Sequence, residues 1–81
     1  MAEKKLILYG RHECHLCQDM LTDLEVLRKE LDFELDFIDV DKDRQLVERY
    51  GMKVPVLVGA GQEICHYFLD KQSLFNYFER R

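Results

Sequence analysis

The distribution of apolar and polar positions along the chain predicts seven secondary-structure elements. Residues 5–9 form a nearly continuous apolar run, which is typical of a short buried strand. From residue 15 to about residue 31 the apolar positions recur at spacings of three and four, the period of an amphipathic helix. These positions are Leu16, Met20, Leu24, Leu27 and Leu31. Residues 33–37 alternate between apolar and acidic side chains, and Ile38 and Val40 extend this predicted strand to residue 40.

The second half of the chain predicts two more helices and a hairpin. The elements are a helix over residues 44–50, strands over residues 54–58 and 64–68, and a helix from residue 71 to about residue 80. Asp43 and Asp70 are predicted N-caps of the two helices, and Gly51 is the predicted C-terminal cap of the first. Gly10 ends the first strand, and Gly59-Ala60-Gly61 is the predicted hairpin turn.

The order of these elements, β-α-β-α-β-β-α, restricts the topology. The first two strands flank a long helix, so we expect them to be parallel with a right-handed crossover. The last two strands are expected to form an antiparallel hairpin. A four-stranded mixed sheet with helices on both faces satisfies both constraints, which places the chain in the α/β class.

Composition and charge exclude several classes of protein. The chain has 81 residues, enough for one domain. Lysine and arginine number 12 against 16 aspartates and glutamates, and this net charge of −4 argues against nucleic-acid binding. No apolar run approaches the length of a bilayer span, and the run after the N-terminal residues 1–5 is too short for a signal-peptide core. We therefore expect a cytoplasmic protein with no membrane association.

The cysteines point to redox chemistry. Three cysteines are too few for the disulfide scaffold of a small secreted domain. Cys14 and Cys17 have Cys-X-X-Cys spacing and lie between a predicted buried strand and the first turn of a helix. Cys14 at the helix N-terminus faces unpaired backbone N–H groups, which favour its thiolate. Cys17 lies one turn later on the apolar stripe, so we expect it to be more buried. This predicts Cys14 as the attacking thiol and Cys17 as the resolving thiol.

Together these motifs resemble the thioredoxin fold, and more closely the small bacterial glutaredoxin-like proteins. The resemblance rests on Tyr9-Gly10, Cys14-His15-Leu16-Cys17, Asp39-Val40-Asp41, Arg49-Tyr50-Gly51 and Val54-Pro55-Val56-Leu57. It covers nearly the whole chain, as a single glutaredoxin-like domain over residues 1–81. It implies a cis Pro55 opposite the cysteine pair, with the Val54 backbone pairing with an extended substrate such as glutathione or a peptide.

Two basic residues near these motifs, Arg11 and Lys53, are candidate substrate-binding residues. For each, an ordinary surface charge is the alternative interpretation. Lys53 replaces the threonine of typical glutaredoxins, and His66 and Tyr67 stand in a stretch where those proteins carry two glycines. The expected protein is a monomeric thiol–disulfide oxidoreductase that has no tightly bound cofactor and binds no metal. Its partners are expected to be a disulfide-containing protein or glutathione, with glutathione as a possible co-substrate.

Two other functions use the same cysteines. In one, His12, Cys14, His15 and Cys17 supply ligands for zinc or an iron–sulfur cluster, and the chain is a metal-binding module. In the other, the chain is a non-catalytic interaction domain of thioredoxin-like fold. Cys65 is expected to be a small buried residue on a strand, with a third redox thiol as its alternative. The acidic residues Asp39, Asp41 and Asp43 are expected to cap helices or face solvent.

Overall fold

The computed structural model describes residues 4–79 and shows the predicted α/β architecture. The elements follow in the order β1 (Lys5–Gly10), α1 (His15–Leu31), β2 (Glu34–Asp39), the 3₁₀ helix η1 (Val40–Lys42), α2 (Arg44–Tyr50), β3 (Val56–Gly59), β4 (Gln62–His66) and α3 (Lys71–Glu79). Only η1 was not predicted, because residues 41–43 read as a polar turn. The predicted end of the last helix, at about Arg80, lies outside the described residues.

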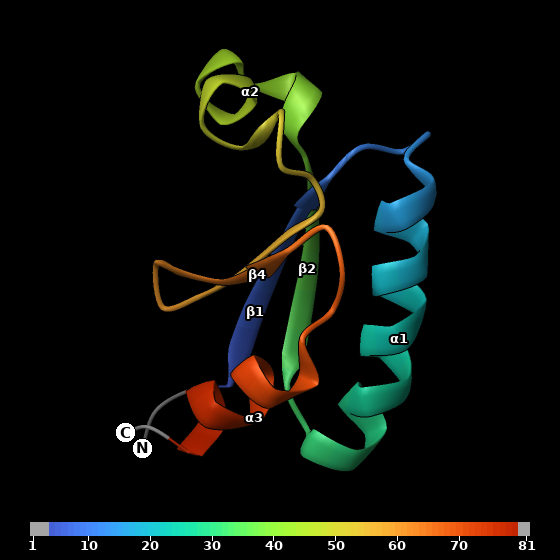
Figure 1. Ribbon diagram of the computed structural model, residues 1–81, viewed down its shortest axis with the longest axis vertical. Helices are drawn as coiled ribbons and strands as arrows, with labels where there is room; N and C mark the ends of the chain where they lie inside the picture. Colours follow the sequence, from blue (N-terminus) through green and yellow to red (C-terminus); the bar gives the residue numbers. More distant parts are fainter. Residues whose placement is uncertain (1–3, 80–81) are drawn as a thin grey trace.

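The strands form one mixed sheet in the order β2-β1-β3-β4. β1 and β2 are parallel, whereas β3 is antiparallel to both β1 and β4. The predicted parallel pair and the predicted hairpin are therefore both confirmed. Figure 1 shows α1 running beside the strands, α3 near one end of the sheet and α2 beyond the other end.

Helices contact both faces of the sheet, as expected. Leu8 of β1 belongs to the same buried cluster as Leu24 of α1 and Leu74 of α3, so α1 and α3 cover one face. Successive strand residues point to opposite faces, and Tyr9 therefore lies on the other side. There its ring stacks on Tyr50 of α2, with the ring centroids 4.4 Å apart.

The hairpin strands begin and end at different residues from those predicted. β3 begins at Val56 rather than Val54, because proline has no N–H to donate to a sheet ladder. The turn is the two-residue pair Ala60-Gly61, with φ of 51° and 77°, the left-handed conformation that tight hairpins need. Gly59 is thus the last residue of β3, and β4 covers residues 62–66 instead of 64–68.

The predicted helix caps are confirmed. The Asp43 carboxylate accepts a hydrogen bond from the Gln45 N–H at 2.9 Å, and Asp70 caps α3 through the Ser73 N–H at 3.2 Å. Gly51 is the C-cap of α2, in a right-handed conformation with φ of −56°. Among residues 4–79, no helix combines the length and the apolar character needed to cross a membrane.

Candidate functional site

The two cysteines of the Cys-X-X-Cys motif lie at the start of α1 and are joined by a disulfide, with their Cα atoms 5.1 Å apart. Cys14 is the N-cap residue of the helix, and its Sγ accepts a hydrogen bond from the Cys17 N–H at 3.1 Å. Cys17 is fully buried, whereas Cys14 is partly exposed. The expected difference in burial is confirmed, and it leaves Cys14 as the sulfur that a substrate can reach.

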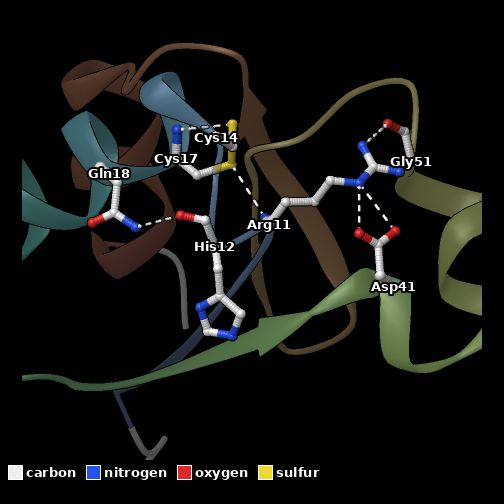
Figure 2. The surroundings of a disulfide bond; sticks show 7 residues. All are labelled: Arg11, His12, Cys14, Cys17, Gln18, Asp41 and Gly51. Carbon is white, nitrogen blue, oxygen red and sulfur yellow. Dashed lines mark hydrogen bonds and ion pairs between the residues drawn. A yellow bond between two sulfur atoms is a disulfide. The ribbon is translucent and has the colours of Figure 1, made fainter.

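The end of β1 is packed directly against Cys17. A Cβ atom on Gly10 would lie 2.9 Å from the Cys17 Sγ and 3.2 Å from its Cβ, so only glycine leaves enough space at this position. The next residue, Arg11, directs its backbone N–H to the Cys17 Sγ at 3.5 Å. Figure 2 shows the disulfide beside this backbone, with Gln18 of α1 bonded to the carbonyl of His12.

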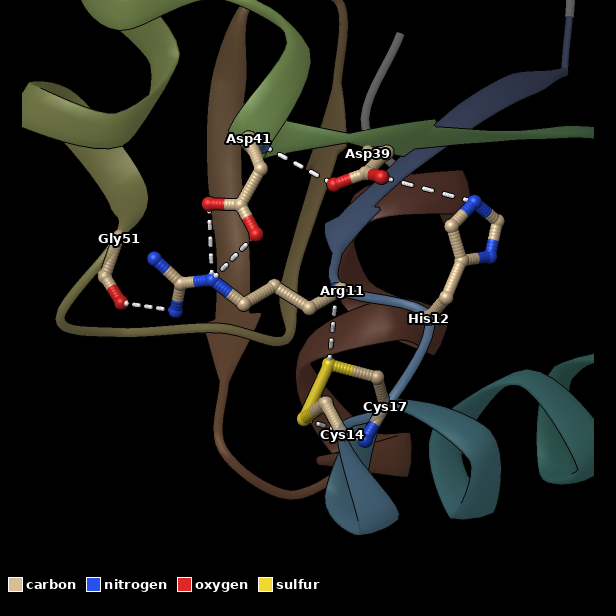
Figure 3. Close-up of polar contacts among 7 residues, drawn as sticks. All are labelled: Arg11, His12, Cys14, Cys17, Asp39, Asp41 and Gly51. Atoms are coloured by element: carbon tan, nitrogen blue, oxygen red, sulfur yellow. Dashed lines mark hydrogen bonds and ion pairs between the residues drawn. A yellow bond between two sulfur atoms is a disulfide. The ribbon is translucent and has the colours of Figure 1, made fainter.

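The Arg11 side chain points away from the disulfide and joins two distant segments. Its Nε donates to both carboxylate oxygens of Asp41, at 3.0 and 3.1 Å, and its Nη1 donates to the Gly51 carbonyl at 2.9 Å (Figure 3). The guanidinium thus ties the segment before the cysteines to η1 and to the end of α2. The Arg11 charge is thus compensated by Asp41 within the protein, and the substrate contact predicted for Arg11 stays a prediction.

Asp39 contributes a second polar contact beside this cluster. One of its carboxylate oxygens accepts from the Asp41 N–H at 3.0 Å, which caps η1, and the other lies 3.5 Å from the His12 Nε2. The expected capping role is confirmed for Asp39 and Asp43. The Arg11–Asp41 pair was missed, because nothing in the sequence links residues 30 positions apart in the chain.

The segment between α2 and β3 leads into the strand that lies beside β1 on the side opposite β2. The Val54–Pro55 peptide bond is cis, as the resemblance implied. Pro55 is also buried. In the antiparallel ladder Tyr9 pairs with Val56, so Pro55 follows alongside Gly10, the residue that contacts Cys17. Within residues 4–79, neither the N–H nor the C=O of Val54 has a backbone hydrogen-bond partner. The Val54 backbone therefore has a donor and an acceptor without a partner in the protein, and its role in binding an extended chain stays a prediction.

Lys53 is held by an ion pair. Its Nζ lies 2.6 Å from one carboxylate oxygen of Glu63, and the His66 Nδ1 lies 2.6 Å from the other. The hydrogen bond from Lys53 lowers the pKa of Glu63, and the bond from His66 adds to this effect against the opposing effect of burial. The Lys53 charge is therefore compensated within the protein, and the substrate contact predicted for it stays a prediction.

The third cysteine lies away from this cluster. Cys65 is half-buried on β4 and packs against the core, and burial raises the pKa of its thiol. Cys65 thus lies on a strand as expected, but it is half-buried where full burial was expected. In the part of the chain that the structure describes, no three or more His, Cys, Asp or Glu side chains are grouped so as to hold a metal ion.

Comparisons with known proteins give the same fold and a family. A family model described as "Glutaredoxin-like domain (DUF836)" matches residues 5–79. The solution structure of protein Ne2328 from Nitrosomonas europaea is 43% identical with a TM-score of 0.85, and the match covers 95% of this chain and 93% of that one. A structural-genomics target protein from X. campestris is 31% identical with a TM-score of 0.70, covering 94% and 97% of the two chains.

More distant structures agree in fold. Reduced glutaredoxin from Escherichia coli is 22% identical with a TM-score of 0.60, and the match covers 95% of each chain. No sequence among the curated proteins matches this chain.

Proposed function

The chain belongs to the glutaredoxin-like domain family, and we propose that it catalyses thiol–disulfide exchange through Cys14 and Cys17. The fold and the cysteine pair give it a thiol redox role in general terms. The observation that carries the proposal is the placement of the Cys14 Sγ at the helix N-terminus, 3.1 Å from the Cys17 N–H. A backbone donor and the positive end of a helix both stabilise a negative charge on sulfur.

The proposed reaction has two exchange steps. In the reduced protein, the Cys14 thiolate attacks one sulfur of a substrate disulfide, forms a mixed disulfide and displaces the other substrate sulfur as a thiolate. Cys17 then loses its proton and attacks the Cys14 Sγ, which forms the internal disulfide and releases the second substrate thiolate. Two electrons pass from the protein dithiol to the substrate, and the two released thiolates take up protons from solvent.

The surrounding residues have supporting roles in this proposal. Val54 and Pro55 form the platform on which the substrate lies, since the Val54 backbone offers a free donor and acceptor. Arg11 holds the platform segment through the Gly51 carbonyl. No tightly bound cofactor is required, because an external thiol reduces the internal disulfide again. We assign the activity to a monomer in the reducing cytoplasm.

The test separates the roles of the two cysteines. Cys17→Ser, incubated with the neutral reagent 2-hydroxyethyl disulfide, is expected to accumulate a mixed disulfide on Cys14, detected by mass spectrometry. Cys14→Ser should form no such adduct at residue 17, and Cys65→Ser should turn over like the unchanged protein. In the reduced protein, iodoacetamide should modify Cys14 first, with a rate midpoint below the ~8.5 of a free cysteine.

Two results would overturn the proposal. Equal labelling of Cys14 and Cys17 with an unshifted midpoint would remove the helix-end argument. Stoichiometric metal in protein purified without added metal, lost in Cys14→Ser, would instead support the metal-binding module.

A further inference from the structure

Three exposed apolar side chains lie in the segments next to the proposed substrate platform, since Met52 precedes Val54 by two residues and Tyr67 and Phe68 directly follow β4. Met52 is 88% exposed, Phe68 67% and Tyr67 42%, and together they form what we term the apolar rim. We propose that this rim selects disulfides within extended polypeptide segments that carry apolar side chains, in preference to small anionic disulfides such as oxidised glutathione. This inference rests on the proposed function and specifies its substrate class.

Tyr67 fixes the rim to the platform. Its backbone N–H donates to the Pro55 carbonyl at 2.9 Å, and its phenol donates to the Met52 carbonyl, also at 2.9 Å. Its φ of 67° lies in the left-handed region, which non-glycine residues rarely adopt, and these two contacts stabilise that conformation. Pro55 lies alongside Gly10, which packs against Cys17. The bond from Tyr67 to Pro55 therefore holds the rim next to the segment that contacts the dithiol.

Two cations next to the platform, Arg11 and Lys53, are already paired within the protein. Arg11 is bonded to both carboxylate oxygens of Asp41, and Lys53 is bonded to Glu63. Glu63 also accepts from His66, and the chain as a whole carries a net charge of −4. An anionic disulfide would have to displace these carboxylates to bind Arg11 or Lys53, and it would approach a protein of net negative charge. Electrostatics therefore disfavours oxidised glutathione, which carries several carboxylates.

An extended polypeptide, in contrast, has both backbone groups and apolar side chains that can bind to this surface. The free N–H and C=O of Val54 pair with peptide backbone, in the manner of a strand added to a sheet edge. The apolar side chains that flank the substrate cystine then cover the exposed surfaces of Met52 and Phe68. Backbone pairing supplies general affinity, whereas the rim supplies the preference for apolar flanks.

The experiment compares three disulfides as substrates of the reduced protein. The probes are oxidised glutathione, a disulfide-linked dimer of a short peptide with leucine and phenylalanine beside its cysteine, and the same dimer with glutamate in their place. We expect kcat/KM to be at least about tenfold higher for the apolar dimer than for oxidised glutathione, with the glutamate dimer below the apolar one. The neutral 2-hydroxyethyl disulfide measures the basal activity.

Rim variants then test the source of the preference. Met52→Gln and Phe68→Ser are each expected to lower kcat/KM for the apolar dimer roughly three- to tenfold, mainly through KM, and to leave oxidised glutathione unaffected. Val26→Ser is the matched control, because Val26 is 59% exposed on α1 outside the rim. It should change the rate with none of the disulfides.

A charge variant tests the argument from paired cations. Glu63→Gln frees Lys53 and His66, so the ratio of the oxidised glutathione rate to the apolar-dimer rate should rise about threefold at low salt and return toward its original value at high salt.

The outcomes separate the two proposals. If oxidised glutathione reacts as fast as the apolar dimer, or if Val26→Ser has the same effect as Phe68→Ser, the rim does not select the substrate, although the redox function stands. An unchanged ratio in Glu63→Gln would likewise count against the selection by charge. If the reduced protein acts on none of the disulfides, including the neutral reagent, the proposed function itself fails.

Discussion

Replacing Gly10 by alanine should disturb the packing between β1 and the resolving cysteine. The added methyl group would lie 2.9 Å from the Cys17 Sγ, 3.2 Å from its Cβ and 3.2 Å from Cε2 of the Phe37 ring. The first distance is shorter than folded proteins tolerate, and the other two are tight. Cys17 is fully buried, so it cannot simply swing into solvent. The strand or the first turn of α1 must therefore move.

The expected effect on stability follows from two opposing terms. Forcing a methyl group into a filled core costs about 1–3 kcal/mol. Replacing glycine by alanine also restricts the unfolded chain, which stabilises the folded state by about 0.4–1 kcal/mol. We therefore expect Gly10→Ala to lower the free energy of unfolding by roughly 1–2 kcal/mol. For a domain of this size, each kcal/mol lowers Tm by roughly 4–8 °C.

The assay is urea unfolding of a double-mutant cycle, with reductant present so that no disulfide contributes. The four proteins are the unchanged chain, Gly10→Ala, Cys17→Ala and the double variant. Because the sulfur is the nearest atom to the new methyl group, Gly10→Ala should cost at least about 0.5 kcal/mol less when Cys17 is alanine. Equal costs in the two backgrounds, or no cost in either, would refute the packing argument.

Three further changes test individual interactions. Asp43→Ala removes the N-cap of α2 and should lower the free energy of unfolding by about 1 kcal/mol in urea titrations, whereas Asp43→Asn should retain most of it; equal losses would exclude capping as the cause. The pKa of Glu63 is lowered from 4.5 in the folded protein, so its contribution to stability is present above that pH and is lost as the pH falls through the folded value. The difference in stability between the unchanged protein and Glu63→Gln should therefore shrink on acidification, and a constant difference from pH 7 to pH 3 would contradict the Lys53 ion pair. Burial raises the pKa of Cys65 above the ordinary value of a thiol, so in a chain with both motif cysteines changed to serine its alkylation should have a midpoint above that of a free cysteine; a midpoint at or below that of a free cysteine would show an accessible thiol.

The types and order of the elements could be predicted because each boundary has a local cause. Asp43 and Asp70 bond to the first turns of their own helices, and the period of α1 is visible within the helix itself. The predicted ends of the hairpin strands were wrong, because long-range contacts determine where these strands begin and end. Tyr67 continues an apolar run, but hydrogen bonds to Met52 and Pro55 hold it in a left-handed conformation, so β4 ends before it.

In the site, too, features with a local cause could be predicted, whereas features set by long-range contacts could not. The different burial of Cys14 and Cys17 follows from their positions at a single helix start, so it was predictable from spacing alone. The partners of Arg11 depend on where β2 and α2 end relative to β1, which only the assembled sheet determines. The sequence therefore shows a basic residue beside the cysteine motif, but it does not show the aspartate, 30 positions further along the chain, that pairs with it.

The anchoring of the segment between α2 and β3 has a consequence for how specificity can change. Arg11 and Tyr67 hold this segment from two sides through the main-chain carbonyls of Gly51, Met52 and Pro55. None of these bonds involves the side chains of positions 52 and 53. Mutations there can therefore alter the chemistry presented to a substrate while the backbone keeps its place, so that new preferences evolve without rebuilding the reactive centre.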